Sequence, residues 1–65
     1  MDVQFKNNLK LLRKERNLTQ QELADELSIT LKTVSHWETG YTEPSLAQLL
    51  FLSDYFNVSL DDLLR

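Results

Sequence analysis

Residues 18–40 read LTQQELADELSITLKTVSHWETG, and this stretch decides the fold. A helix is expected to begin just after Thr19, because Thr19 and Glu22 have the spacing of a capping box, in which each side chain hydrogen-bonds the other residue's backbone N–H. Apolar residues then recur at helical spacing, at Leu23, Ala24 and Leu27. The first half of the stretch therefore predicts a short amphipathic helix.

A second helix is expected to follow almost at once. The segment Ser28-Ile29-Thr30 is short enough for a tight turn, and Thr30 suits the N-cap position of the next helix. Gly40 is expected to end that helix, because glycine adopts a positive φ without steric cost. Two helices joined by so short a turn indicate a helix-turn-helix at about residues 19–39.

The second helix has two unlike faces when its residues are placed at about 100° intervals. Val34, Trp37 and Glu38 fall on one side, which we expect to pack inward. The other side carries polar groups that donate or accept hydrogen bonds, at Lys32, Ser35, His36 and Thr39. Such a face suits the base edges of the DNA major groove, which are recognised by hydrogen bonds. An ordinary solvated helix face is the alternative.

The flanking sequence predicts three more helices and no strand, because apolar residues keep helical spacing throughout. Asparagine tolerates the left-handed conformation that ends many helices. A serine that is followed by Gln or Asp three residues later is typical of a helix start. The expected segments are about 3–16, ended by Asn17; 45–57, opened by a second capping box; and a short last helix capped by Ser59. We therefore predict one all-α domain of five helices over residues 1–65.

Charge is distributed unevenly along the chain. The 65 residues carry a net charge of −3, whereas nucleic-acid-binding domains usually carry an excess of Lys and Arg. Residues 5–17, however, contain five basic side chains and one acidic one, while residues 18–27 contain three acidic side chains and no basic one. The acidic groups therefore cluster away from the first helix.

Composition excludes several classes of protein. A chain of this length allows one domain, and the absence of Cys with a single His argues against disulfides and a structural zinc site. The first residues, Met1 to Gln4, lack the basic and apolar segments of a signal peptide, and no stretch is apolar enough to span a membrane. We expect a cytoplasmic protein without metal, cofactor or enzymatic activity. The sequence does not decide between a complete protein and the N-terminal part of a longer one.

Four segments, in this order and spacing, resemble the lambda-repressor-like (Cro/repressor-type, xenobiotic-response-element) helix-turn-helix family. They are LTQQELA at 18–24, VSHWETG at 34–40, EPSL at 43–46 and NVSLDDLL at 57–64. The resemblance extends over roughly residues 7–64 and thus covers nearly the whole chain. Members of this family are typically dimeric repressors, antitoxins or restriction-control proteins. The resemblance implies a compact five-helix domain with one helix-turn-helix. The second helix of that motif is expected to enter the major groove of DNA.

The resemblance also implies roles for individual residues. Lys32 and His36 occupy positions that usually contact bases, with Leu31, Thr33 and Ser35 beside them. Leu31 suits a thymine methyl group or partial packing, Lys32 a guanine or a phosphate, and His36 either a base or solvent. Contacts to the DNA backbone are implied for Gln20, Thr30, Thr39, Tyr41 and Thr42.

Arg13 and Glu38 match a pair that commonly forms a salt bridge between the first and third helices of the family. Because Glu38 is expected on the inner face and a buried carboxylate needs a partner, we interpret Arg13 as structural rather than DNA-binding. Ser28 lies where the family commonly has Gly, which predicts slight backbone strain.

Candidates for a dimer surface come from apolar residues near the end of the chain, since exposed apolar groups can mark an interface. They are Phe51, Phe56, Val58 and Leu64, of which Phe56 and Val58 are also candidates for the core. The sequence thus predicts a transcriptional repressor that binds a palindromic operator in double-stranded DNA as a homodimer. A protein-interaction module on the same fold, such as an antitoxin or docking domain, is the alternative.

Overall fold

The computed structural model describes residues 3–65, and five α-helices account for the regular structure in that range. The helices are α1 (Phe5–Glu15), α2 (Gln20–Leu27), α3 (Leu31–Thr39), α4 (Leu46–Phe56) and α5 (Leu60–Leu64). The all-α prediction with five helices is confirmed. The expectation of no signal segment rests partly on Met1 and Asp2, which lie outside the described residues.

Each helix from α2 to α5 begins at a hydroxyl side chain, as the sequence indicated. Thr19 Oγ1 accepts the Glu22 N–H at 3.0 Å, and the Glu22 carboxylate accepts the Thr19 N–H at 2.8 Å. The same reciprocal arrangement opens α4, and Thr30 and Ser59 cap α3 and α5. These caps satisfy backbone donors that every helix start leaves free, and each contributes about 1 kcal/mol.

Left-handed backbone conformations connect the helices. Asn17, Ser28 and Asn57 have φ of 57°, 56° and 55°, and Gly40 has φ of 82°. The predicted helix ends at Asn17 and Gly40 are therefore confirmed, and Ser28 does adopt the conformation for which Gly is better suited. Residues other than Gly and Asn pay about 1–2 kcal/mol for this conformation.

The start of α1 differs from the sequence prediction. The helix was expected from Val3, but Gln4 lies outside helical geometry, with φ −111° and ψ 27°, and is the N-cap. The Gln4 N–H donates to the Leu64 carbonyl at 2.8 Å, and the Asn8 amide donates to the Leu63 carbonyl at 3.0 Å. The segment before α1 is therefore hydrogen-bonded to the end of α5 and does not lengthen α1.

Every helix contributes to one core. The side chains of Leu9, Leu23, Val34, Leu52 and Leu63, one from each helix, are fully buried, and Phe5, Ala24, Trp37 and Phe56 surround them. A chain of this size buries only about 60% of its unfolded surface, so this single cluster carries most of the hydrophobic stabilisation. Among residues 3–65, no helix combines the length and apolarity needed to cross a membrane.

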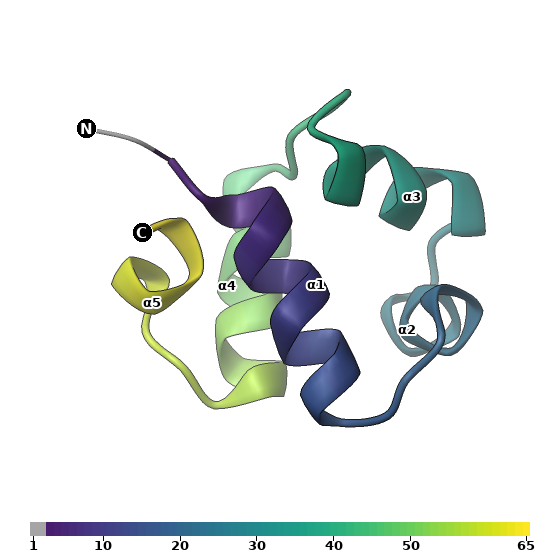
Figure 1. Ribbon diagram of the computed structural model, residues 1–65, viewed down its shortest axis with the longest axis horizontal. Coiled ribbons are helices and arrows are strands. Elements are labelled where there is room, and N and C mark those ends of the chain that lie inside the picture. Colours follow the sequence, from purple (N-terminus) through teal and green to yellow (C-terminus); the bar gives the residue numbers. More distant parts are fainter. Residues whose placement is uncertain (1–2) are drawn as a thin grey trace.

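The arrangement leaves α3 at one margin of the molecule. In Figure 1, α1 crosses the middle, α2 and α3 lie on its right, and α4 and α5 lie behind it and on its left. Contacts between α1 and α3 and between α2 and α3 hold the inner side of α3. Its opposite side faces solvent.

Gly40 offers a test of how the end of α3 is specified. We expect Gly40→Ala to lower the free energy of unfolding by about 1–2 kcal/mol, because Ala is strained at a positive φ, and its methyl group would lie 3.1 Å from Lys6 Cδ. Gly40→Asn is the matched control and should lose less, since Asn tolerates this conformation. Urea unfolding measures both, and equal stability of Gly40→Ala and the parent chain would contradict the assignment.

Candidate nucleic-acid interface

The turn between α2 and α3 sets the direction of α3. The left-handed Ser28 reverses the chain, and the Ile29 N–H donates to the Ala24 carbonyl at 3.0 Å, which closes the end of α2. Thr30 then returns to extended geometry and caps the next helix. Two short helices are thus joined by three residues, which is the geometry of a helix-turn-helix.

The two faces of α3 are divided as the sequence predicted. Val34, Trp37 and Glu38 are 0%, 2% and 3% exposed and lie on the inner side. On the other side, Lys32 and Thr39 are exposed, and at the margin between the two sides Leu31 is 43% exposed. Thr33, Ser35 and His36 are half-buried. The structure therefore brings the five predicted base-contacting side chains together on one helix, and no DNA is present to test the contacts themselves.

Two threonine hydroxyls lie together at the amino end of α3. Thr30 Oγ1 accepts the Thr33 N–H at 3.2 Å and lies 2.9 Å from Thr33 Oγ1, with which it shares a hydrogen bond. Both residues were predicted to contact DNA. Thr30 was expected at the sugar-phosphate backbone and Thr33 at a base. Their mutual hydrogen bond holds the two hydroxyls side by side in the free protein.

The carboxyl end of α3 carries the other predicted backbone contacts. Thr39, Tyr41 and Thr42 are exposed, Tyr41 at 77%. Thr39 Oγ1 donates to the His36 carbonyl at 3.2 Å, and the rings of His36 and Tyr41 lie 4.7 Å apart between centroids. The His36 ring is thereby supported from its carboxyl-terminal side, a contact that the sequence did not reveal.

A buried ion pair holds α3 against α1, and the predicted salt bridge is present. Arg13 Nε donates to Glu38 Oε2 at 2.7 Å, and Arg13 Nη2 donates to Glu38 Oε1 at 3.0 Å. Arg13 Nη1 also donates to the Leu18 carbonyl at 2.7 Å, just before α2. Arg13 is 9% and Glu38 3% exposed. The hydrogen bonds that Arg13 donates to Glu38 raise the pKa of Arg13, against the opposing effect of burial.

Gln20 joins this pair from the amino end of α2. Its Nε2 donates to Glu38 Oε1 at 3.1 Å, so Glu38 accepts from both α1 and α2. The sequence predicted a phosphate contact for Gln20 and did not predict this internal bond. The half-buried amide has a second N–H beyond the one given to Glu38.

The candidates for a dimer surface separate in the structure. Phe56 is 4% exposed and belongs to the core, so it is not a surface residue, and its alternative assignment is the correct one. Val58 and Leu64 are half-buried and pack against the core. Phe51 is 48% exposed on α4. Two further exposed apolar residues on that helix were not among the predicted candidates, Leu46 at 68% and Leu50 at 49%.

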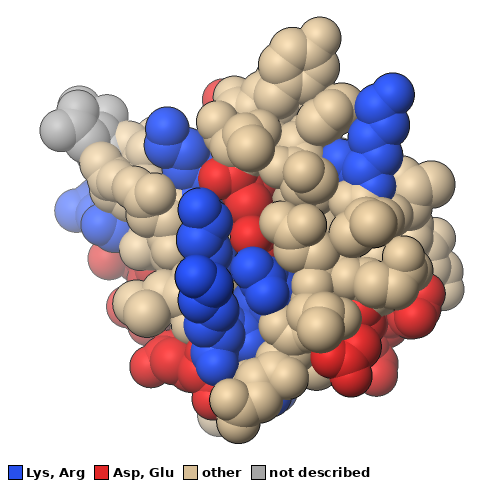
Figure 2. All heavy atoms as spheres, turned by 45° about the vertical axis from the view of Figure 1, so that its right-hand side comes forward, with Lys and Arg blue, Asp and Glu red and all other residues tan. Residues whose placement is uncertain are grey.

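Charged side chains are unevenly distributed on the face that contains α2 and α3. Figure 2 brings that side forward and shows a column of Lys and Arg atoms, with Asp and Glu atoms against its upper end and in further groups at the lower left and lower right. Within residues 3–65, no group of three or more side chains is arranged to hold a metal ion.

Comparison with known proteins agrees with this geometry. The helix-turn-helix family model of Cro/C1 type matches residues 9–63, and the chain belongs to that family. A solved transcriptional regulator from Listeria innocua has the same fold, with a TM-score of 0.93 and 34% sequence identity over 98% of this chain and 60% of that one.

Three curated relatives carry names that refer to transcription. YqaE of Bacillus subtilis, named as an HTH-type transcriptional regulator, is 44% identical over 94% of this chain and 53% of its own length. The transcriptional activator BcrR of Enterococcus faecalis is 37% identical over 95% and 30%. The phage transcriptional repressor RstR of Vibrio cholerae is 33% identical over 94% and 54%. The chain thus spans about half or less of these relatives, and the region it matches contains the helix-turn-helix.

The buried pair predicts a large stability effect. We expect Glu38→Gln to lower the free energy of unfolding by about 3–5 kcal/mol, because it leaves the Arg13 guanidinium buried without its counter-charge. The double variant Arg13→Met, Glu38→Leu should recover most of that loss, since apolar groups of similar volume remove both charges. Urea unfolding of the parent, single and double variants measures this, and a Glu38→Gln loss below 1 kcal/mol would contradict a structural role.

Proposed function

We propose that this protein represses transcription by binding a palindromic operator in double-stranded DNA as a homodimer. The observation that carries the proposal is the outward face of α3, a row of hydrogen-bonding side chains on a helix held firmly from behind by Arg13, Glu38 and Gln20. A preorganised reading helix loses little conformational entropy on binding. Because the proposed partner is chromosomal DNA, we place the protein in the cytoplasm.

Each end of α3 has its own part in the proposed complex. Lys32 and His36 read base edges in the major groove, flanked by Leu31, Thr33 and Ser35. Thr30 at one end, and Thr39, Tyr41 and Thr42 at the other, contact the sugar-phosphate backbone and fix the register. Gln20 gives its remaining N–H to a phosphate at the amino end of α2, where helix N–H groups favour an anion.

A two-fold dimer gives the operator its symmetry. Two copies of α3 in successive major grooves would lie about 34 Å apart, so the two half-sites should be separated by about one helical turn. Occupation of a promoter by such a dimer excludes polymerase without any enzymatic step.

Selection from a random duplex pool at near-physiological salt tests operator reading. We expect enrichment of a near-palindromic sequence by the parent chain and none by the Lys32→Ala, His36→Ala variant, because both base contacts are removed without touching the core. Circular dichroism must show that the variant is folded. A folded parent chain that enriches no sequence would contradict the proposal.

The outward side of α4 is the proposed dimer surface. Leu46, Leu50 and Phe51 are exposed on it, and a free apolar surface on a small domain is stabilised by burial against a second copy. This surface keeps Phe51 from the sequence prediction and replaces Phe56, which is buried.

Leu50→Glu should convert the dimer to a monomer, because it places a carboxylate in the centre of the apolar contact. Leu11→Glu is the matched control, since Leu11 is 59% exposed on α1, and it should leave the dimer intact. Sedimentation equilibrium measures the association of each variant. A dimer of unchanged affinity in Leu50→Glu would exclude this surface.

A protein-interaction module is the second candidate function. The observation that favours it is the exposed acidic side of α2, with Glu22, Asp25 and Glu26, a surface that would repel DNA phosphates. The selection experiment separates the two, because a docking module would be folded and would enrich no duplex.

A further inference from the structure

Three lysines form a row along α1. They belong neither to the hydrophobic core nor to the predicted DNA contacts of α3. Lys6, Lys10 and Lys14 are spaced by four residues and are all exposed. At 3.6 residues per turn this spacing places them on one side of the helix. We refer to these three residues as the α1 lysine row. None of them takes part in an ion pair within residues 3–65.

Two contacts show that the row begins, at Lys6, on the flank of α1 nearest α3. At one end, Lys6 passes close to the carboxyl end of α3, where a methyl group built on Gly40 would lie 3.1 Å from Lys6 Cδ and 3.6 Å from Lys6 Nζ. Farther along, Arg13 binds Glu38 of α3. At about 100° per residue, Arg13 lies close in angle to Lys6, whereas Lys14 is turned about 100° away from Arg13. Asn8, in contrast, bonds to α5, which marks the opposite flank of α1.

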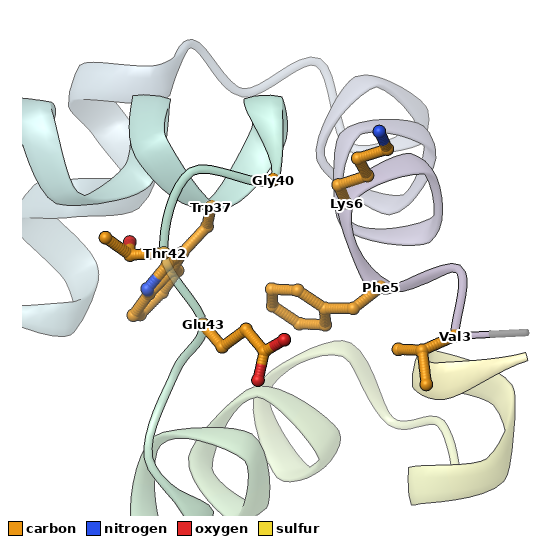
Figure 3. Close-up of a pocket in the computed structure, with 7 residues that line it drawn as sticks. All are labelled: Val3, Phe5, Lys6, Trp37, Gly40, Thr42 and Glu43. Carbon is orange, nitrogen blue, oxygen red and sulfur yellow. The ribbon is translucent and has the colours of Figure 1, made fainter.

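The close-up of the pocket beside Gly40 shows how Lys6 is placed. Phe5 and Trp37 line the pocket, and Lys6 stands at its edge with the ammonium group away from the Glu43 carboxylate (Figure 3). The aliphatic part of Lys6 covers apolar surface while its charge stays in water, as long cationic side chains commonly do. The charge is therefore held near Gly40, next to the exposed Thr39 and Tyr41.

We propose that the α1 lysine row is a second contact with the DNA backbone, which extends the phosphate contacts of α3 along one strand. From Lys6 to Lys14 the row measures about 12 Å, at 1.5 Å per residue. That length equals the rise of three or four phosphates on one strand, at about 3.4 Å each. The inference rests on the proposed function, because the anion is the duplex whose bases α3 reads.

The row resolves the conflict between an acidic chain and a polyanionic partner. The net charge of −3 would repel DNA if it were spread evenly, but exposed charges act over only about a Debye length, roughly 10 Å at 0.1 M salt. Within that distance, α1 presents three exposed lysines, of which Lys6 lies beside α3, against the nearby Glu43, while the acidic side chains of α2 lie apart from them (Figure 2). The local potential, rather than the net charge, then determines binding.

The salt dependence of DNA affinity tests the row directly. The variants are Lys10→Gln, Lys14→Gln and their double, measured on the selected operator and on an unrelated duplex of equal length. Each lost phosphate contact should reduce the slope of log K against log salt by about 0.9, and both duplexes should be affected alike. Arg65→Gln is the charge-matched control, because Arg65 lies after α5 and pairs only with the exposed Asp61.

The outcomes separate this inference from the proposed function. Slopes for the double variant that equal those of Arg65→Gln, with operator binding by the parent chain intact, would overturn the row alone. A parent chain that binds neither duplex would overturn the proposed function and the row together. A loss confined to the operator would also contradict the row, because phosphate contacts do not discriminate between sequences.

Discussion

The bidentate ion pair between Arg13 and Glu38 is the constraint on which the rest of the structure depends. It joins α1 to α3, and the additional bonds to the Leu18 carbonyl and the Gln20 amide bring in both the approach to α2 and its first residue. Removing two charges from water costs free energy of desolvation, so the pair adds little net stability. It contributes specificity instead, because its hydrogen bonds form only when α1, α3 and the start of α2 are correctly placed. The orientation of the reading helix is therefore fixed by hydrogen bonds as well as by apolar packing. Among the described residues, no buried side-chain polar atom lacks a partner.

Much of the fold follows from local chemistry that is visible in the sequence. Hydroxyl residues at Thr19, Thr30, Ser45 and Ser59 mark four helix starts, and Asn17 and Gly40 mark two ends, because caps depend on residues within one turn. The two faces of α3 also follow from helical periodicity. The family resemblance added the salt bridge, which the contacts of Arg13 confirm. The expected roles in DNA binding remain predictions, since they concern a partner that is not part of the structure.

The remaining features depend on contacts between distant segments, which periodicity does not reveal. Phe56 and Phe51 are both apolar residues on α4, yet only Phe56 is buried, because burial is decided by what packs against the helix. The start of α1 is shortened by a bond between Gln4 and Leu64, residues at opposite ends of the described chain. Lys6 is likewise an ordinary exposed lysine in the sequence, and only the fold brings it to Gly40. The basic excess of residues 5–17 was visible in the sequence, but the position of Lys6 beside α3 was not.

The bond between Gln4 and Leu64 has a consequence for how this domain can be combined with others. It brings the backbone before α1 beside the end of α5, on the side of α1 away from α3 (Figure 1). The backbone at Gln4 and the backbone at Leu64 therefore leave the domain on the same side, away from the α3 surface. An attachment at this side, for example a fluorophore on the last residues, would stand clear of the outward face of α3.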